Sequence, residues 1–293
     1  MTEPLLQAEH LTKRFAGGTL AVDDVSLTVH AGETVGIVGE SGCGKSTTAK
    51  LILRLIDADA GSLRFAGTDL GGLKGSKLRA LRKQLQLVPQ HPLTAFNPRL
   101  SIGDSIAFNM IVHGTPKSTA KAKAREWLER VGVPGEHLGK RPKELSGGQL
   151  QRAAIARALV TEPQLVVCDE AVSALDKSVQ AQVLNLLDEL QQETGVAYLF
   201  ISHDLAVVEH VSDRVACMYL GRVVEEGPAQ ALWDAPAHPY TEALLSATPE
   251  RMADRVRLVG EPPSPSNPPS GCTFRTRCPV ATDACATARP PLV

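Results

Sequence analysis

Between residues 34 and 46 the chain reads Thr34-Val35-Gly36-Ile37-Val38-Gly39-Glu40-Ser41-Gly42-Cys43-Gly44-Lys45-Ser46. The apolar run at 34–38 predicts a buried strand, and the glycines after it predict a tight loop. Leu51, Ile52 and Leu55 then follow at helical spacing, which predicts a helix over 45–56. A strand, a glycine loop and a helix in this order indicate an α/β core.

The loop itself, Gly39–Ser46, matches the pattern G-x-x-x-x-G-K-[S/T] in full. In such a loop the backbone N–H groups wrap phosphates, and the lysine, here Lys45, neutralises the β/γ oxygens. The following hydroxyl, here Ser46, ligates Mg²⁺. The complete pattern, placed between a strand and a helix, favours a phosphate-binding loop over a glycine-rich turn with a chance lysine.

The rest of the chain alternates strands with helices, which implies a parallel sheet with right-handed crossovers. The expected strands are 25–29, 62–65, 85–88, 164–168 and 196–201, and the expected helices are 76–83, 125–131, 152–160 and 178–193. A hairpin-like segment is expected at 214–226, and the polar, helical stretch 91–149 is expected to be an insertion into the core.

Composition excludes several classes of protein. The 293 residues are 43% hydrophobic and 22% charged, as in a globular protein with a real core. A formal charge of −1 gives no electrostatic case for nucleic acid as the main partner. Runs of about 18 apolar residues, as spanning helices need, are absent from the sequence, and the first residues lack a signal-peptide core. We therefore expect the protein to remain in the cytoplasm.

Polar side chains stand where predicted strands end. Asp169 and Glu170 close the apolar strand 165–168; Asp169 fits a role in holding Mg²⁺ through water, and Glu170 a role in activating the attacking water. The alternative is a solvated acidic pair that begins a loop. Gln90 and His203 also follow predicted strands, and they gain meaning only from that placement.

A second phosphate-gripping turn is predicted at Leu145-Ser146-Gly147-Gly148-Gln149-Leu150-Gln151-Arg152. Ser146 supplies a hydroxyl, and the two glycines let the backbone approach an anion closely, just before the helix expected at 152–160. One nucleotide rarely needs two such cradles from one chain.

Taken together, the motifs resemble those of ABC-transporter ATPase subunits over about residues 5–228. The matching motifs are Gly39–Ser46 (Walker A), Gln90 (Q-loop), Leu145–Arg152 (signature), Leu165–Glu170 (Walker B), Ser173–Asp176 (D-loop) and His203 (H-loop). The resemblance implies a P-loop NTPase (RecA-like) core with an N-terminal β-subdomain and an inserted helical subdomain. It also implies that the signature of one subunit grips the γ-phosphate held by the Walker A loop of another, which explains the second cradle.

The resemblance carries a set of site residues. It implies ATP and Mg²⁺ as cofactors, with Glu170, His203 and Gln90 as the catalytic residues. Phe15 matches the aromatic residue that stacks on adenine, although it could equally be plain core. The implied nucleotide-binding residues are Phe15, Gly39, Glu40, Ser41, Gly42, Cys43, Gly44, Lys45, Ser46, Thr47, Asp169, Ser146, Gly147, Gly148 and Gln149, and the implied Mg²⁺ ligands are Ser46, Gln90 and Asp169.

Three further stretches resemble the oligopeptide/dipeptide importer branch of this family. They are 171–187, His238–Leu245, and the Pro/Cys-rich region with 260–265 and 271–279. The branch implies import of di- or oligopeptides, two membrane-spanning permeases, an external solute-binding protein and a second ATPase, identical or paralogous. It implies a peripheral location on the cytoplasmic face of the cell membrane.

Two alternatives to this assignment differ in class. The same role for nickel, glutathione or another small solute remains open, because the ATPase contacts the permeases and not the cargo. A non-transport ABC ATPase acting on nucleic acid or ribosomes usually has tandem cassettes, long coiled coils or strongly basic surfaces, and the sequence shows none of these.

We divide the chain into four segments. Residues 1–90 are the N-terminal part of the core and 91–152 the helical subdomain; 153–228 complete the core, and 229–293 form a small C-terminal extension. One departure from the branch lies in the Q-loop, which usually continues Gln-Asp-Pro and here reads Gln90-His91-Pro92.

Cys272, Cys278 and Cys285 are spaced C-x5-C-x6-C. Structural zinc sites favour tighter pairs, so the spacing is a weak metal signal. Some members of the resembling branch carry a [4Fe–4S] cluster here, usually completed by a further downstream cysteine that the sequence through Val293 lacks. An iron–sulfur cluster, free thiols and zinc all remain open.

Overall fold

The computed structural model describes residues 3–248, 256 and 258–292. The chain divides into two compact units. Unit 1 comprises residues 1–30, 34–71 and 200–293, and unit 2 comprises residues 31–33 and 72–199.

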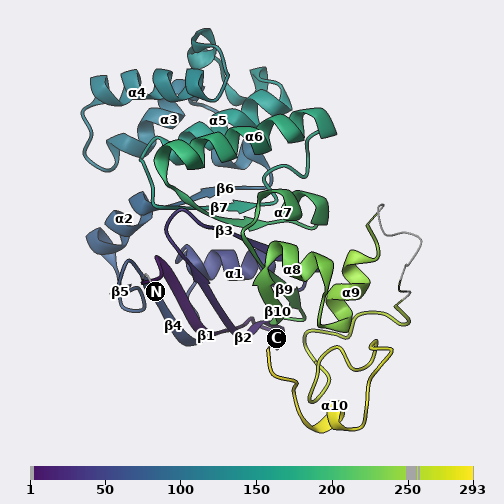
Figure 1. Cartoon of the computed structure of the whole chain (residues 1–293). Coiled ribbons are helices and arrows are strands. Elements are labelled where there is room, and N and C mark those ends of the chain that lie inside the picture. Colours follow the sequence, from purple (N-terminus) through teal and green to yellow (C-terminus); the bar gives the residue numbers. More distant parts are fainter. Residues whose placement is uncertain (1–2, 249–255, 257, 293) are drawn as a thin grey trace. The chain divides into compact units, whose positions relative to one another are not determined.

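Unit 1 contains an antiparallel four-stranded sheet in the order β2-β1-β4-β5 (Figure 1). Its strands are β1 (Leu6–Arg14), β2 (Leu20–Val29), β4 (Ala60–Phe65) and β5 (Thr68–Asp69). Leu6 and Ala8 of β1 are buried on one face, because residues two apart share a face of a strand, and the buried Leu11 follows a register shift between Ala8 and Leu11.

The same unit holds the strand that feeds the glycine loop. Every residue of β3 (Thr34–Val38) is buried, and β3 pairs in parallel with β9 (Arg214–Tyr219). β9 turns back into β10 (Arg222–Pro228), so the predicted hairpin is confirmed.

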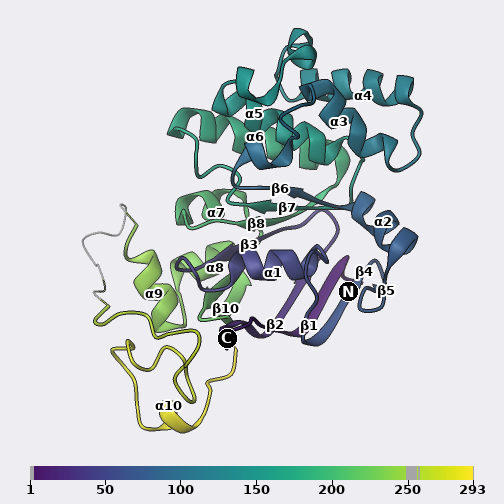
Figure 2. The same cartoon turned by 180° about the vertical axis from the view of Figure 1, so that it is seen from behind.

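The helix after the loop, α1 (Lys45–Ile52), packs beside β2 (Figure 2). The expected extent, 45–56, was too long. Arg54 adopts φ 52°, a left-handed conformation that ends the helix, and its guanidinium pairs with Asp57. The later helices of unit 1 are α7 (Leu205–Val211), α8 (Ala229–Asp234), α9 (Pro239–Leu245) and α10 (Ala284–Thr287).

Unit 2 combines two parallel strands, β6 (Leu85–Val88) and β7 (Leu165–Asp169), with helices (Figure 1). The polar insertion forms three mutually packed helices, α3 (Ile102–Ile111), α4 (Lys117–Arg130) and α5 (Gly147–Leu159). The remaining elements of the unit are α2 (Gly75–Gln84), the short 3₁₀ helices η1 (Pro92–Ala95), η2 (Gly135–Gly139) and η3 (Pro142–Glu144), and α6 (Lys177–Thr194). The strand β8 (Ala197–Ile201) carries the chain from unit 2 into unit 1.

The first residues of α5 correct the sequence prediction. The helix was expected to begin at Arg152, but it begins at Gly147. Ser146 is the N-cap: its hydroxyl accepts the Gln149 N–H at 3.3 Å, and the Gln149 side chain accepts the Ser146 N–H at 3.2 Å. This reciprocal capping box outweighs the low helix propensity of two adjacent glycines.

The architecture is that of a mixed α/β P-loop fold, with parallel strands beside helices in each unit, as the sequence predicted. Among the described residues, every helix is too short or too polar to cross a lipid bilayer.

Candidate nucleotide site

Glycine geometry shapes the loop after β3. Gly39 has φ 150°, and a Cβ atom there would lie 2.2 Å from the Met218 carbonyl oxygen of β9. Gly44 has φ 112°, and a Cβ atom there would lie 2.3 Å from the Ala21 carbonyl oxygen. Both the backbone conformation and the space therefore require glycine at the two ends of the loop.

The Lys45 side chain lies inside this loop. It is only 5% exposed, and its ammonium donates to the Gly39 carbonyl at 2.6 Å and the Glu40 carbonyl at 3.1 Å. Burial raises the pKa of the neighbouring Cys43 thiol, and the charge of Lys45 opposes that shift. A buried cation surrounded by loop backbone is suited to exchange its carbonyl partners for phosphate oxygens.

His203 belongs to the same region of unit 1. The preceding Ser202 N–H donates to the Ile37 carbonyl of β3 at 3.3 Å, which fixes this turn next to the strand that leads into the loop. Gly39, Glu40 and His203 line one cavity of about 720 Å³ together with residues of α9. The structure thus brings His203 to the phosphate-binding loop.

Phe15 lies in the turn after β1. Its N–H donates to the Thr19 carbonyl at 2.9 Å, and the residue is 42% exposed. The alternative of a plain core residue is therefore wrong for Phe15, and an exposed ring is free to stack on a flat partner. The other residues assigned from the sequence follow the loop: Ser41, Gly42 and Ser46 are exposed, and Thr47 is half-buried in α1.

In unit 2, two predicted catalytic residues touch. The Gln90 amide donates to the Glu170 carboxylate at 2.5 Å, with Asp169 just before it at the end of β7. Glu170 has φ 50°, a left-handed conformation that costs a non-glycine residue roughly 1–2 kcal/mol. The backbone N–H and the hydroxyl of Ser173 both donate to the Glu170 carbonyl, at 3.1 and 3.0 Å, which holds this strained residue in place.

The signature residues form the start of α5. Ser146 and Gln149 cap it, and a Cβ atom on Gly148 would lie 2.8 Å from the Val179 side chain of α6. Asp176 caps α6 through the Val179 N–H, and this bond lowers the pKa of its carboxyl. The backbone N–H groups at the start of α5 are the donors that a phosphate would need.

Sequence reasoning missed two residues that contact the loop. Arg277 pairs with the Glu40 carboxylate, and the Tyr240 hydroxyl accepts the Glu40 N–H at 2.9 Å. Both lie in the C-terminal extension, more than half the chain away in sequence. The only signal was the match of these stretches to the peptide-importer branch.

The three late cysteines do not fit a metal cluster. Their residues are half-exposed, and the described parts of the chain contain no group of three His, Cys, Asp or Glu side chains that could hold a metal ion. The Cys272 N–H donates to the Cys285 carbonyl at 2.8 Å, so the loop is closed by backbone hydrogen bonds. The Thr282 N–H and hydroxyl lower the pKa of the Cys285 thiol, whereas burial raises the pKa of the Cys278 thiol. The expectation of a [4Fe–4S] cluster is therefore not supported.

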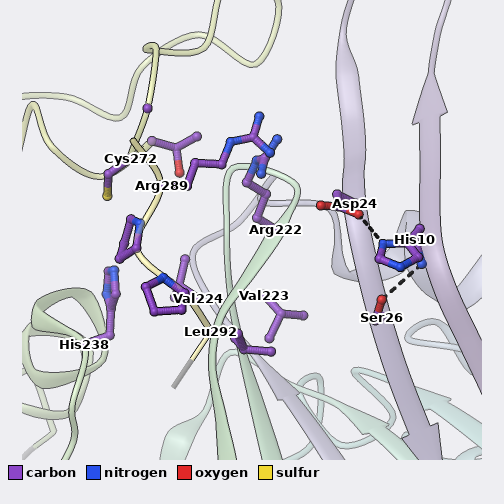
Figure 3. Close-up of a pocket in the computed structure, with 14 residues that line it drawn as sticks. His10, Asp24, Ser26, Arg222, Val223, Val224, His238, Cys272, Arg289 and Leu292 are labelled. Atoms are coloured by element: carbon purple, nitrogen blue, oxygen red, sulfur yellow. Dashed lines mark hydrogen bonds and ion pairs between the residues drawn. The ribbon is translucent and has the colours of Figure 1, made fainter. Parts of the chain in front are cut away.

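Figure 3 shows a cavity of about 350 Å³ where the last residues of the extension lie against β1, β2 and β10. Two of its charged lining residues have ion-pair partners. The His10 ring bonds to the Asp24 carboxylate at 2.7 Å within the lining, and Arg222 pairs with Asp23, which lies outside it. Cys272, Arg289 and Leu292 come from the extension, which therefore packs on the core through several separate segments.

Two family models match the chain. The ABC transporter model matches residues 22–173, and the model of the oligopeptide/dipeptide transporter C-terminal region matches residues 224–285. Together they account for the phosphate-binding loop and for most of the extension.

Curated relatives match over nearly the full length. A probable peptide ABC transporter ATP-binding protein of Sinorhizobium fredii, y4tS, is 51% identical and is aligned over 100% of this chain and 87% of its own. The oligopeptide transport ATP-binding protein OppF of Salmonella typhimurium is 49% identical over 93% of this chain and 84% of its own.

Solved structures resemble the fold. A dimer of the ATP-binding cassette MJ0796 in a post-hydrolysis state with ADP and Pi has a TM-score of 0.71 at 27% identity, covering 76% of this chain and 98% of that one. The cbiO1 protein of Clostridium perfringens, part of the ABC transporter complex cbiONQ, has a TM-score of 0.72 at 26% identity, covering 86% of this chain and 98% of its own.

The phosphate-binding loop, the Gln90–Glu170 contact and the similar proteins all point to the same family. The chain belongs to the ABC transporter family, as an ATP-binding and ATP-hydrolysing subunit with the C-terminal region of the oligopeptide/dipeptide transporters.

Proposed function

We propose that the chain powers the import of di- or oligopeptides and that it is bound at the cytoplasmic face of the cell membrane. The observation that carries the proposal is the match of residues 224–285 to the oligopeptide/dipeptide transporter C-terminal region, in relatives named as peptide transport proteins. The four-segment division made from the sequence (1–90, 91–152, 153–228 and 229–293) is part of this proposal.

In the proposed site, Gly39–Ser46 and Thr47 bind the phosphates and Phe15 stacks on adenine. Lys45 already lies inside the loop, and on binding ATP its ammonium exchanges the carbonyl oxygens of Gly39 and Glu40 for phosphate oxygens. Ser46, Asp169 and Gln90 hold Mg²⁺, since a hydroxyl, a carboxylate and an amide oxygen are the hard ligands that this ion prefers. Bound Mg²⁺ neutralises charge on the β- and γ-phosphates.

Glu170 is the proposed base that orients and deprotonates the attacking water. The Gln90 amide donates a hydrogen bond to one carboxylate oxygen of Glu170, so the Q-loop fixes the direction of this side chain. The turn that carries Glu170 is strained, and strain of this kind is retained where a side chain must point in one direction. His203 contacts the γ-phosphate from the cavity it shares with Gly39 and Glu40.

Ser146, Gly147, Gly148 and Gln149 are proposed to serve a partner ATPase. The backbone N–H groups of Gly147 and Gly148 and the Ser146 hydroxyl complete the site in which the partner's Walker A loop holds ATP, since the capping box already uses the N–H groups of Ser146 and Gln149. The dimeric MJ0796 cassette with ADP and Pi supports such an arrangement. Closing of the dimer on ATP would switch two permeases, which receive cargo from an external solute-binding protein; hydrolysis would reopen it.

Uptake by cells tests the cargo. Cells that lack this chain are complemented with the wild type or with Glu170→Gln, and uptake of labelled dipeptides, longer peptides, glutathione and nickel is measured. The proposal expects ATP-dependent uptake of a peptide class only with the wild type. If the wild type restores uptake of nickel or glutathione but not of peptides, that solute and not a peptide is the cargo.

A further inference from the structure

Glu40 brings a negative charge into the phosphate-binding loop. It places a carboxylate in a loop that binds a polyanion, where an unpaired negative charge would repel the phosphates. In this structure the carboxylate is paired. Arg277 donates to both of its oxygens, at 3.0 and 3.1 Å, in a bidentate geometry.

The Arg277 side chain is buried next to an aromatic ring. It is 8% exposed, and its guanidinium lies 5.9 Å from the Tyr219 ring centroid. Burial disfavours the charged guanidinium, but the hydrogen bonds to Glu40 and Tyr219 outweigh burial and raise the pKa of Arg277. A fixed, charged, forked donor cancels the charge of Glu40 better than solvent would.

The turn that carries Arg277 is anchored by an aromatic cluster. Phe274 is fully buried, and its ring centroid lies 5.2 Å from that of Tyr219 and 5.4 Å from that of Tyr240. The Arg277 N–H donates to the Phe274 carbonyl at 2.9 Å. Tyr240 in turn accepts the Glu40 N–H, so both the backbone and the side chain of Glu40 are bound by the extension.

The extension also touches the segment that carries Phe15. The Leu20 N–H donates to the Pro265 carbonyl at 3.2 Å, and the hydroxyls of Thr19 and Ser266 lie 3.1 Å apart. The extension therefore contacts both the phosphate loop and the turn proposed to bind adenine, all within unit 1.

We propose that Arg277 is a positioning residue of the phosphate-binding loop: it neutralises Glu40 and holds it away from the space of the triphosphate. The inference rests on ATP binding by Gly39–Ser46. It gives the C-terminal extension a direct part in nucleotide affinity, in addition to any docking role.

The test measures the affinity of the purified full-length chain for MgATP, MgADP and adenosine by titration calorimetry. Arg277→Met removes the charge at similar length, and should weaken MgATP about tenfold, MgADP less and adenosine not at all, because the repulsion by Glu40 grows with ligand charge. Arg275→Met is the matched control, since Arg275 stands in the same turn but bonds to the Ser270 carbonyl instead. It should leave all three affinities unchanged.

Two further variants separate charge from support. Glu40→Gln should bind MgATP a few-fold more tightly than the wild type, because Arg277 keeps its positive charge beside the loop, and Glu40→Gln with Arg277→Met should bind within about threefold of Glu40→Gln alone. Arg277→Lys, which keeps the charge, should recover most of the MgATP affinity. Equal losses for all three ligands in Arg277→Met, or MgATP binding in Glu40→Gln that is unchanged or weaker, would overturn the inference. Failure of the wild type to bind MgATP would instead reject the nucleotide site itself.

If Arg277→Met does not fold, Glu40→Gln still decides. That variant removes the repelling charge without removing Arg277, so the neutralising role predicts a few-fold stronger binding of MgATP, and unchanged or weaker binding would overturn it.

Discussion

At the scale of single residues, the contact between Gln90 and Glu170 joins two of the residues proposed to catalyse ATP hydrolysis. A glutamate in a left-handed conformation costs free energy, and it is stabilised here by the two Ser173 hydrogen bonds to its carbonyl and by the Gln90 amide on its carboxylate. A side chain that is proposed to deprotonate water must point at that water, and this requirement outweighs the free-energy cost of the left-handed backbone.

Glu170→Gln tests that role. The amide keeps the size of the side chain and a hydrogen-bonding oxygen, but it cannot accept a proton from water. We expect ATP hydrolysis to fall by about 10²–10⁴-fold while the affinity for MgATP changes little. Phosphate release and nucleotide titration measure the two quantities, with Glu189→Gln on α6 as the control. Unchanged turnover would reject Glu170 as the base.

How much of the site the sequence predicted differs from residue to residue. The strand, the glycine loop and Lys45 were predictable, because local spacing determines them. The ion pair between Arg277 and Glu40 was not, because it joins positions far apart in sequence and no local pattern encodes such a pair. The iron–sulfur cluster was suggested by the resemblance to the importer branch and only weakly by the cysteine spacing, and the described residues show no ligand set for it.

At the scale of elements, α5 shows how capping decides a boundary. Two glycines predicted a turn before the helix, yet Ser146 and Gln149 satisfy the free N–H groups and let the helix begin at Gly147. The strands at 34–38, 165–169 and 197–201 were predicted to within one residue, because a continuous apolar run of this length is typical of a strand buried on both faces. Before residue 34 only 25–29 was predicted, whereas the structure has β1 and the longer β2 (Leu20–Val29). Helix ends depended on caps and on single left-handed residues such as Arg54, which composition does not reveal.

A pair of cap variants separates stability from function. Ser101 caps α3 as Ser146 caps α5, each accepting the N–H three residues on. Ser146→Ala and Ser101→Ala should each lower the free energy of unfolding by about 1 kcal/mol in urea titrations. Only Ser146→Ala should also reduce hydrolysis several-fold in the assembled transporter, since its hydroxyl is proposed to contact the partner's nucleotide. Equal hydrolysis in the two variants would show that Ser146 only caps α5 and does not contact the partner's nucleotide.

At the scale of the whole molecule, the extension is tied to the core partly through His238, whose backbone N–H donates to the Glu225 carboxylate of β10 at 3.0 Å. Its ring packs against Phe274 at 5.7 Å between centroids, and its Nδ1 accepts the Tyr240 N–H at 3.1 Å. Burial lowers the pKa of His238 from the ordinary 6.5, although the nearby Glu225 carboxylate opposes that shift. The folded chain therefore binds this proton less readily than the unfolded chain does.

The pH dependence follows from that sign. The stability linked to His238 is fully present above pH of about 6.5, and it is lost as the pH falls through the ordinary pKa toward the lowered one. His238→Asn keeps an acceptor for the Tyr240 N–H but does not titrate. The free energy of unfolding should fall between pH 7.5 and 5.5 more steeply in the wild type than in this variant. His113, whose pKa is also lowered by burial, is present in both proteins and cancels. Parallel curves would contradict the assignment.

The central claim is that the signature turn serves the nucleotide of a partner subunit and not that of its own chain. Gly147→Asp tests it most directly, because a Cβ atom there meets nothing within 4 Å and an acidic residue suits the start of a helix. The reference protein is Glu170→Gln, mixed with its partner ATPase if the two subunits are not identical. Light scattering after gel filtration should show that its mass doubles when MgATP is added. Adding Gly147→Asp should abolish that doubling while the isolated chain binds MgATP as before. A dimer that survives Gly147→Asp, or a matching loss of MgATP affinity in the isolated chain, would contradict the account.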